Sequence, residues 1–159
     1  MKFVAVTAIL LLIPCTSAAT TGENEWRFGA AVASTPALAL DAGILHDFTD
    51  FWAFGASVRG GHSFTSAPTT FAAATADLRL AIDALQWIPA IELGLGAGLS
   101  GAGGPTPLAR GGLSLAWRPA RSWGVVVRVE GQASTPQNLE MWGGLQFVHF
   151  GGSGIGLDL

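Results

Sequence analysis

The sequence is poor in several residue types, and these shortages narrow what the protein can be. It has no tyrosine, a single cysteine at position 15, and a single lysine at position 2. Only 12% of its residues are charged, whereas a soluble domain usually carries about 25–35% Asp, Glu, Lys and Arg on its surface. Because half of the residues are also apolar, we do not expect an ordinary water-exposed surface.

The same shortages exclude several classes of site. The chain has no basic patch and a formal net charge of −3, so a nucleic-acid partner is not expected. Its three histidines, His46, His62 and His149, are far apart in the sequence, so no metal site and no cofactor are predicted. After residue 20, no stretch reaches the ~18 uncharged apolar residues that a membrane helix needs.

The first residues have the composition of a secretory signal. Lys2 provides a positive start, residues 3–13 form a short apolar run, and small residues follow up to Ala19. We therefore expect residues 1–19 to be a signal peptide and residues 20–159 to form one domain. Cys15 would leave with the signal, and Pro14 before it departs from the pattern of a lipoprotein signal, which is the alternative.

The sequence does contain period-two alternation of apolar with small or polar residues, repeated eight times. Residues two apart share a face of a strand, and Pro, Gly, Ser, Asn and Asp separate the alternating segments. Two points of this prediction stay open. Residues 75–85 also fit an Ala-rich amphipathic helix. The last strand can end at Phe150 or at Leu159. The predicted strands are residues 25–34, 38–46, 51–62, 70–84, 90–100, 108–118, 123–133 and 139–150.

The two faces of these segments differ in the same way throughout. In the third segment, for example, Trp52 and Phe54 lie on one face and Arg59 on the other. All strand charges share a face with glycine and serine. Eight strands enclose only enough room for their own side chains, so rows of Trp, Phe, Leu and Val would overfill the inside of a soluble, lipocalin-like barrel. The pattern predicts an all-β fold instead, an eight-stranded antiparallel up-and-down transmembrane β-barrel whose bulky face meets lipid.

The small face would then line a narrow lumen that contains both arginines and carboxylates. A confined charge must be paired or hydrated, and arginine can bind a carboxylate through two N–H groups. We expect a salt-bridge network that fills the lumen; solvated surface charges are the alternative. The predicted network residues are Arg27, Asp41, Arg59, Asp77, Arg79, Asp83, Glu92, Arg110, Arg118, Arg128, Glu130 and Glu140.

Aromatic residues concentrate at one end of the predicted strands, the end that has the chain termini and the second, fourth and sixth connections. Aromatic girdles mark membrane interfaces, so we expect this end to be periplasmic and the opposite loops to be extracellular. The predicted interface aromatics are Trp26, Phe48, Phe51, Trp52, Trp87, Trp117, Trp123, Phe147 and Phe150.

With its signal, eight alternating segments, aromatic turns and charged lumen, the chain resembles the small outer membrane β-barrel proteins of the OmpA/OmpX type. The resemblance covers most of the mature chain and lies in its architecture. Family members commonly end in a strand with a terminal aromatic, which "GLQFVHF", ending at Phe150, approximates; the absence of tyrosine departs from the family. The resemblance implies the bacterial outer membrane as location, and membrane lipid and the insertion machinery as partners. It leaves the oligomeric state open.

A structural or interaction role is the function that these features favour. A narrow passive pore is one alternative, although the predicted network would occlude it. A lipid-modifying enzyme is another, because barrels of the lipid A deacylase type use a His-x-Ser arrangement. Here His62 and Ser63 are adjacent and point to opposite faces, and no nucleophile has an oriented base. No catalytic residue is therefore predicted.

Overall fold

The computed structural model describes residues 22–82, 87–101, 104–134 and 139–152. These residues form eight strands and the turns between them. Asp83 and the residues after Gly152 lie outside the described residues. The strand bounds are Glu23–Ala33 (β1), Ala37–Asp47 (β2), Trp52–Ser63 (β3), Thr69–Ala81 (β4), Trp87–Ser100 (β5), Thr106–Ala120 (β6), Trp123–Ala133 (β7) and Leu139–Gly152 (β8).

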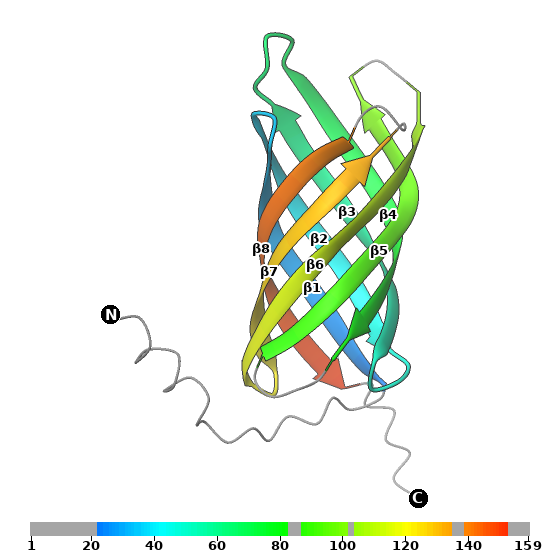
Figure 1. Ribbon diagram of the computed structural model, residues 1–159, viewed down its shortest axis with the longest axis vertical. Helices are drawn as coiled ribbons and strands as arrows, with labels where there is room; N and C mark the ends of the chain where they lie inside the picture. The colour runs from blue at the N-terminus through cyan, green and yellow to red at the C-terminus, as the bar shows by residue number, and fades with distance from the viewer. Residues whose placement is uncertain (1–21, 83–86, 102–103, 135–138, 153–159) are drawn as a thin grey trace, which may run out of the picture.

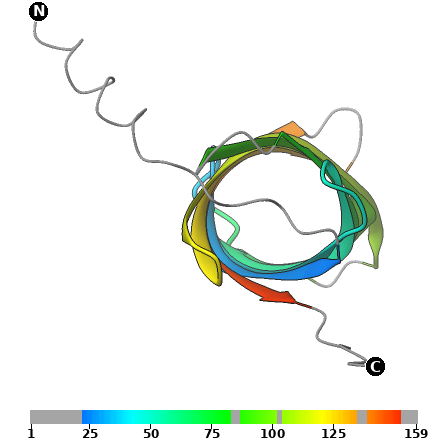
Figure 2. The ribbon, with the colours of Figure 1, turned by 90° about the horizontal axis from the view of Figure 1, so that it is seen from below.

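The strands form a closed barrel in which each pairs antiparallel with its neighbours in sequence, as Figure 1 and the view along the barrel in Figure 2 show. Pairing of β1 with β8 closes the ring, from Glu23 opposite Gly152 to Ala33 opposite Trp142. Closure gives every strand a hydrogen-bonding partner on both sides, which is the condition for β-structure in lipid. Among the described residues, no helix is long and apolar enough to span a membrane.

The predicted fold class is confirmed, and the alternation located all eight strands to within a few residues. The helix considered for residues 75–85 is wrong over its described part, because β4 continues as a strand to Ala81. The last strand extends past Phe150 and ends at Gly152. The later predicted end, Leu159, lies outside the described residues.

The bulky apolar residues point outward. Leu93 is 55% exposed, Leu113 66% and Val127 54%, whereas Arg59 and Arg128 are 4% and 3% exposed. The arrangement expected of a soluble barrel, with apolar side chains inside and charges outside, is therefore wrong. The interior is not wholly polar, because two apolar clusters flank its charges.

One of these clusters lies toward the end of the barrel with the β2–β3, β4–β5 and β6–β7 connections, which we call the turn end. It contains Ile88, Val126, Val148 and Phe150 together with alanines. The other lies toward the opposite end, the loop end, and contains Trp142 with three alanines and the partly buried Phe71. Small residues dominate both clusters because the lumen is narrow.

Candidate functional site in the barrel interior

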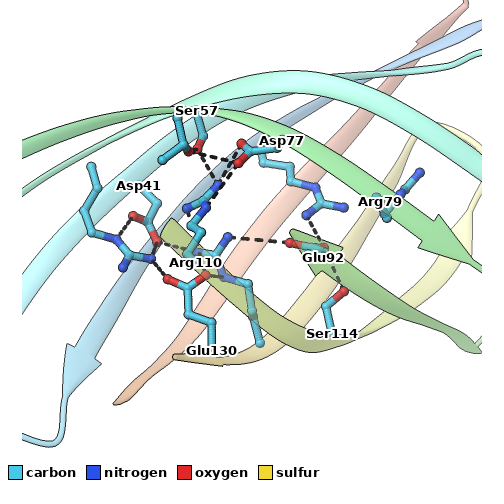
Figure 3. A network of polar contacts seen from close by, with 12 residues as sticks. Asp41, Ser57, Asp77, Arg79, Glu92, Arg110, Ser114 and Glu130 are labelled. Carbon is cyan, nitrogen blue, oxygen red and sulfur yellow. Dashed lines mark hydrogen bonds and ion pairs between the residues drawn. The ribbon is translucent and has the colours of Figure 1, made fainter. Parts of the chain in front are cut away.

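Most interior charges of the described residues form a continuous network across the lumen, part of which is shown close up in Figure 3. Arginines of β1, β3, β4, β6 and β7 take part, and most of their ion pairs join strands that are not neighbours in the sheet. The connected residues are Arg27, Arg59, Arg79, Arg110, Arg128, Glu25, Asp41, Asp47, Asp77, Glu92 and Glu130.

Glu25 connects two arginines at the turn-end side of this network. It is fully buried, and Nε of Arg27 donates to its Oε1 at 2.8 Å. Nη1 of Arg79 lies 2.5 Å from its other oxygen, while Nη2 of Arg79 reaches Asp47 at 2.7 Å. A buried carboxylate needs such compensation, because its desolvation alone costs several kcal/mol.

Asp41 is shared by two arginines in the middle of the barrel. Nε of Arg59, its neighbour in the β2–β3 register, donates to Oδ1 at 2.6 Å. Nη2 of Arg128, from β7, donates to Oδ2 at 2.8 Å. Both arginines also pair with Glu130. Charge-assisted bonds of this kind are roughly twice as strong as neutral ones, so this cluster ties β2, β3 and β7 together.

Gly94 allows a third contact between strands that are not adjacent. It lies between Asp77 and Arg110 in the register of β4, β5 and β6. A methyl group there would overlap Oδ1 of Asp77 and sit 2.7 Å from Nε of Arg110. Without it, Arg110 crosses β5 to reach Asp77 at 2.7 Å and donates to Ser57 at 2.6 Å.

Arg118 forms a separate pair near the turn end. Its Nη2 lies 3.1 Å from Glu23 of β1 and donates to the carbonyl of Arg121 at 2.6 Å. Its guanidinium also lies 3.9 Å from the ring centroid of Phe150. Phe150 is 8% exposed, so its predicted place among the outward interface aromatics is wrong. It shares strand parity with Gln146, which also points inward.

Glu140 lies inside the barrel but outside the network. Its carboxylate accepts a hydrogen bond from Thr35 and one from the indole N–H of Trp142, the latter at 3.0 Å. Asp83, the remaining predicted network residue, lies outside the described residues. Sequence reasoning omitted Glu25 from the network, although its parity with Arg27 identifies it as inward-facing.

Outside the barrel, an aromatic row follows the turn end. Trp87, Trp117, Trp123 and Phe147 come from four successive strands, and each ring centroid lies 6.2 Å from the next. Trp26 and Trp52 point outward at the same end, and Phe48 and Phe51 are exposed in the β2–β3 turn.

The ion pairs leave little free space in the middle of the lumen. A cavity among Arg27, Glu92, Arg110 and Arg128 has a volume of about 20 Å³, and a single water needs roughly 10–15 Å³. A second cavity of about 20 Å³ lies near Arg79, Arg118 and Phe150. The ion pairs around these cavities join strands on opposite sides of the lumen.

Comparison with known proteins identifies the fold. No protein-family model and no curated protein matches the chain. Among solved structures, the N-terminal β-barrel domain of OprF from Pseudomonas aeruginosa is similar with a TM-score of 0.64 and 12% identity, over 82% of this chain and 98% of that one. OprG, an outer membrane protein of the same organism, has a TM-score of 0.62 and 9% identity over 84% and 97%.

Ail, the attachment invasion locus protein of Yersinia pestis, has a TM-score of 0.58 and 14% identity, over 82% of this chain and 99% of that one. A de novo designed transmembrane β-barrel matches equally well, with a TM-score of 0.58 and 8% identity over 85% and 100%. The chain thus has the fold of small transmembrane β-barrels. At these identities the comparison establishes architecture only.

Proposed function

We propose that this protein is an integral β-barrel of a bacterial outer membrane, with an ion-paired and largely occluded lumen. We propose that it has a structural or interaction role. The observation that supports this most is the inverted distribution of side chains. Outward-facing Leu93, Leu113 and Val127 are more than half exposed, while Arg59 and Arg128 are buried. Exposing so much apolar surface is favourable only where hydrocarbon replaces water.

The aromatic row at the turn end supports a specific orientation. Indole rings prefer the membrane–water boundary, where an apolar body and a polar N–H are both accommodated. We therefore place the turn end at the periplasmic interface and the β1–β2, β3–β4, β5–β6 and β7–β8 loops outside the cell. An exported chain with a signal at residues 1–19 reaches this membrane through the insertion machinery, which is the partner that this function requires.

Cell fractionation tests the location. The full-length protein should appear in the outer membrane fraction, and it should migrate differently on gels with and without heating, because a closed barrel resists detergent until it is heated. A soluble periplasmic protein without heat-dependent migration would refute the proposal.

Occlusion separates the structural role from that of a passive pore. The central cavity of about 20 Å³ leaves no room for a hydrated ion, so purified protein in planar bilayers should give no steady single-channel current. Frequent, uniform channel openings by the wild-type protein would favour the pore instead.

The histidine surroundings support a non-catalytic role. The ring of His46 contacts the side-chain oxygen of Asn24 at 3.0 Å, and the ring of His62 contacts the hydroxyl of Thr70 at 3.3 Å. In the described ranges neither ring has the carboxylate partner that would orient a general base. Mass analysis of lipid A from overexpressing cells tests this, and a change in acyl chains that depends on His62 would contradict it.

A further inference from the structure

The loop end of the lumen is hollow, unlike its middle. A cavity of about 350 Å³ lies there among the ends of the strands, and small-molecule sites commonly measure about 300–1,000 Å³. Trp142, 2% exposed, closes its inner side together with Phe71, whose ring centroid is 5.6 Å away. The guanidinium of Arg59 lies 4.7 Å from the Trp142 ring. We call this cavity the loop-end cup.

Hydroxyl groups line much of the cup wall. Ser63, Thr69, Ser100 and Thr106 contribute them from four successive strands, and Ser134 adds one at the end of β7. A hydroxyl can both donate and accept hydrogen bonds. Such a wall suits a ligand that carries several hydroxyl groups of its own.

Glu140 is the acidic residue of the cup, and it differs from the other buried carboxylates in its partners. The carboxylates Glu23, Glu25, Asp41, Asp47, Asp77, Glu92 and Glu130 each have an arginine nitrogen within 4.0 Å. Within the described residues, Glu140 has no such partner. Its hydrogen bonds from Thr35 and Trp142 occupy two of its roughly four acceptor positions. The remaining positions and the uncompensated charge favour a cation.

We propose that the loop-end cup binds a small organic ammonium ion that carries hydroxyl groups, such as an amino sugar or an amino alcohol. The ammonium group of the ligand donates hydrogen bonds to Glu140, and the hydroxyl groups of the ligand form hydrogen bonds with the serines and threonines. The apolar face of the ligand packs on Phe71. This activity goes beyond a structural role and requires no transport through the lumen.

Glucosamine is a suitable probe, and glucose is its control because it has the same ring without the charge. The full-length barrel is held in polyoxyethylene micelles, whose headgroups are neither charged nor sugars. The indole N–H resonance of Trp142 reports binding, because that group bonds directly to Glu140. Millimolar glucosamine should shift it in a saturable way, and glucose should bind at least about tenfold more weakly, because a charge-assisted hydrogen bond is roughly twice as strong as a neutral one.

Three variants separate the cup from non-specific effects. Glu140→Gln should remove the preference for glucosamine, while Glu23→Gln, at the opposite end of the barrel, should retain it. Ser100→Phe should block the cup and abolish the shift by both sugars. Equal affinity for the two sugars, no saturable shift, or an unchanged preference in Glu140→Gln would each overturn the proposal.

A lipid headgroup is a second source of the ammonium group that the proposal places at Glu140. In vesicles that contain phosphatidylethanolamine, a Trp142 shift that appears without glucosamine and disappears in Glu140→Gln identifies the headgroup as the ligand. If glucosamine is still needed there, the ligand is a soluble amine.

Discussion

Arg27 of β1 and Glu92 of β5 meet across the lumen, with Nη1 of the arginine 2.6 Å from Oε1 of the carboxylate. These strands lie opposite one another in the eight-stranded ring. Replacing Arg27 with Met leaves Glu92 and Glu25 buried with one arginine fewer. We expect a loss of about 3–5 kcal/mol in the free energy of unfolding, as when one partner of a buried ion pair is removed.

Urea titration of the refolded barrel in vesicles measures this loss. In the double variant Arg27→Met/Glu92→Met, the cost should be clearly smaller than the sum of the two single changes. Additive costs would mean that the two side chains do not stabilise each other across the lumen.

Gly94→Ala tests the crossing of Arg110 over β5. A methyl group would overlap Oδ1 of Asp77 and approach Nε of Arg110 to 2.7 Å, so we expect destabilisation by about 1–3 kcal/mol from overpacking. Gly60→Ala is the matched control, since a methyl there meets nothing within 4 Å. Equal stability of the two variants in the same urea titration would contradict the role assigned to Gly94.

Phe150→Leu tests the inward position of this residue against Arg118. Loss of the cation–π contact, with the guanidinium 3.9 Å from the ring centroid, should cost up to about 2 kcal/mol in this desolvated place. Phe147→Leu, on the outer face at 50% exposure, should cost less because leucine also packs well against lipid. The reverse order in thermal or urea unfolding would place Phe150 at the lipid face.

Val127→Arg tests the lipid face at the middle of β7. The free energy of folding into vesicles should become less favourable by about 2–4 kcal/mol, as for arginine at the bilayer midplane. Leu139→Arg, at the loop end of β8, is the depth control and should cost only about 0–1 kcal/mol because its charge reaches the interface. Wild-type folding of Val127→Arg would reverse the assignment of faces.

The strands and their two faces could be predicted because alternation is a local property. Trp52 and Arg59 differ in parity, and parity alone decides which side of a sheet a residue occupies. The same rule, applied consistently, would have placed Phe150 inside with Gln146 and would have added Glu25 beside Arg27. Phe150 lies near the end of β8, as interface aromatics do, but its parity turns its ring toward the lumen.

The partners within the network could not be predicted in this way. Asp41 and Arg59 are direct neighbours in the register, but Arg79 and Glu92, which are also in register, pair with other residues. Which groups meet across the lumen depends on the tilt and stagger of the strands. The lack of an arginine partner for Glu140 among the described residues could not be predicted for the same reason. It depends on which carboxylates each arginine side chain can contact in the folded barrel.

The central claim is that the bulky face of the barrel meets hydrocarbon. Nitroxide labels at Leu93, Leu113 and Val127, each introduced as a single cysteine in a Cys15→Ser chain, test it most directly by collision with oxygen and with a water-soluble nickel chelate in vesicles. The account predicts frequent collisions with oxygen and few with the chelate at all three positions. Labels shielded from oxygen, or readily reached by the chelate, would show that these residues do not face the lipid.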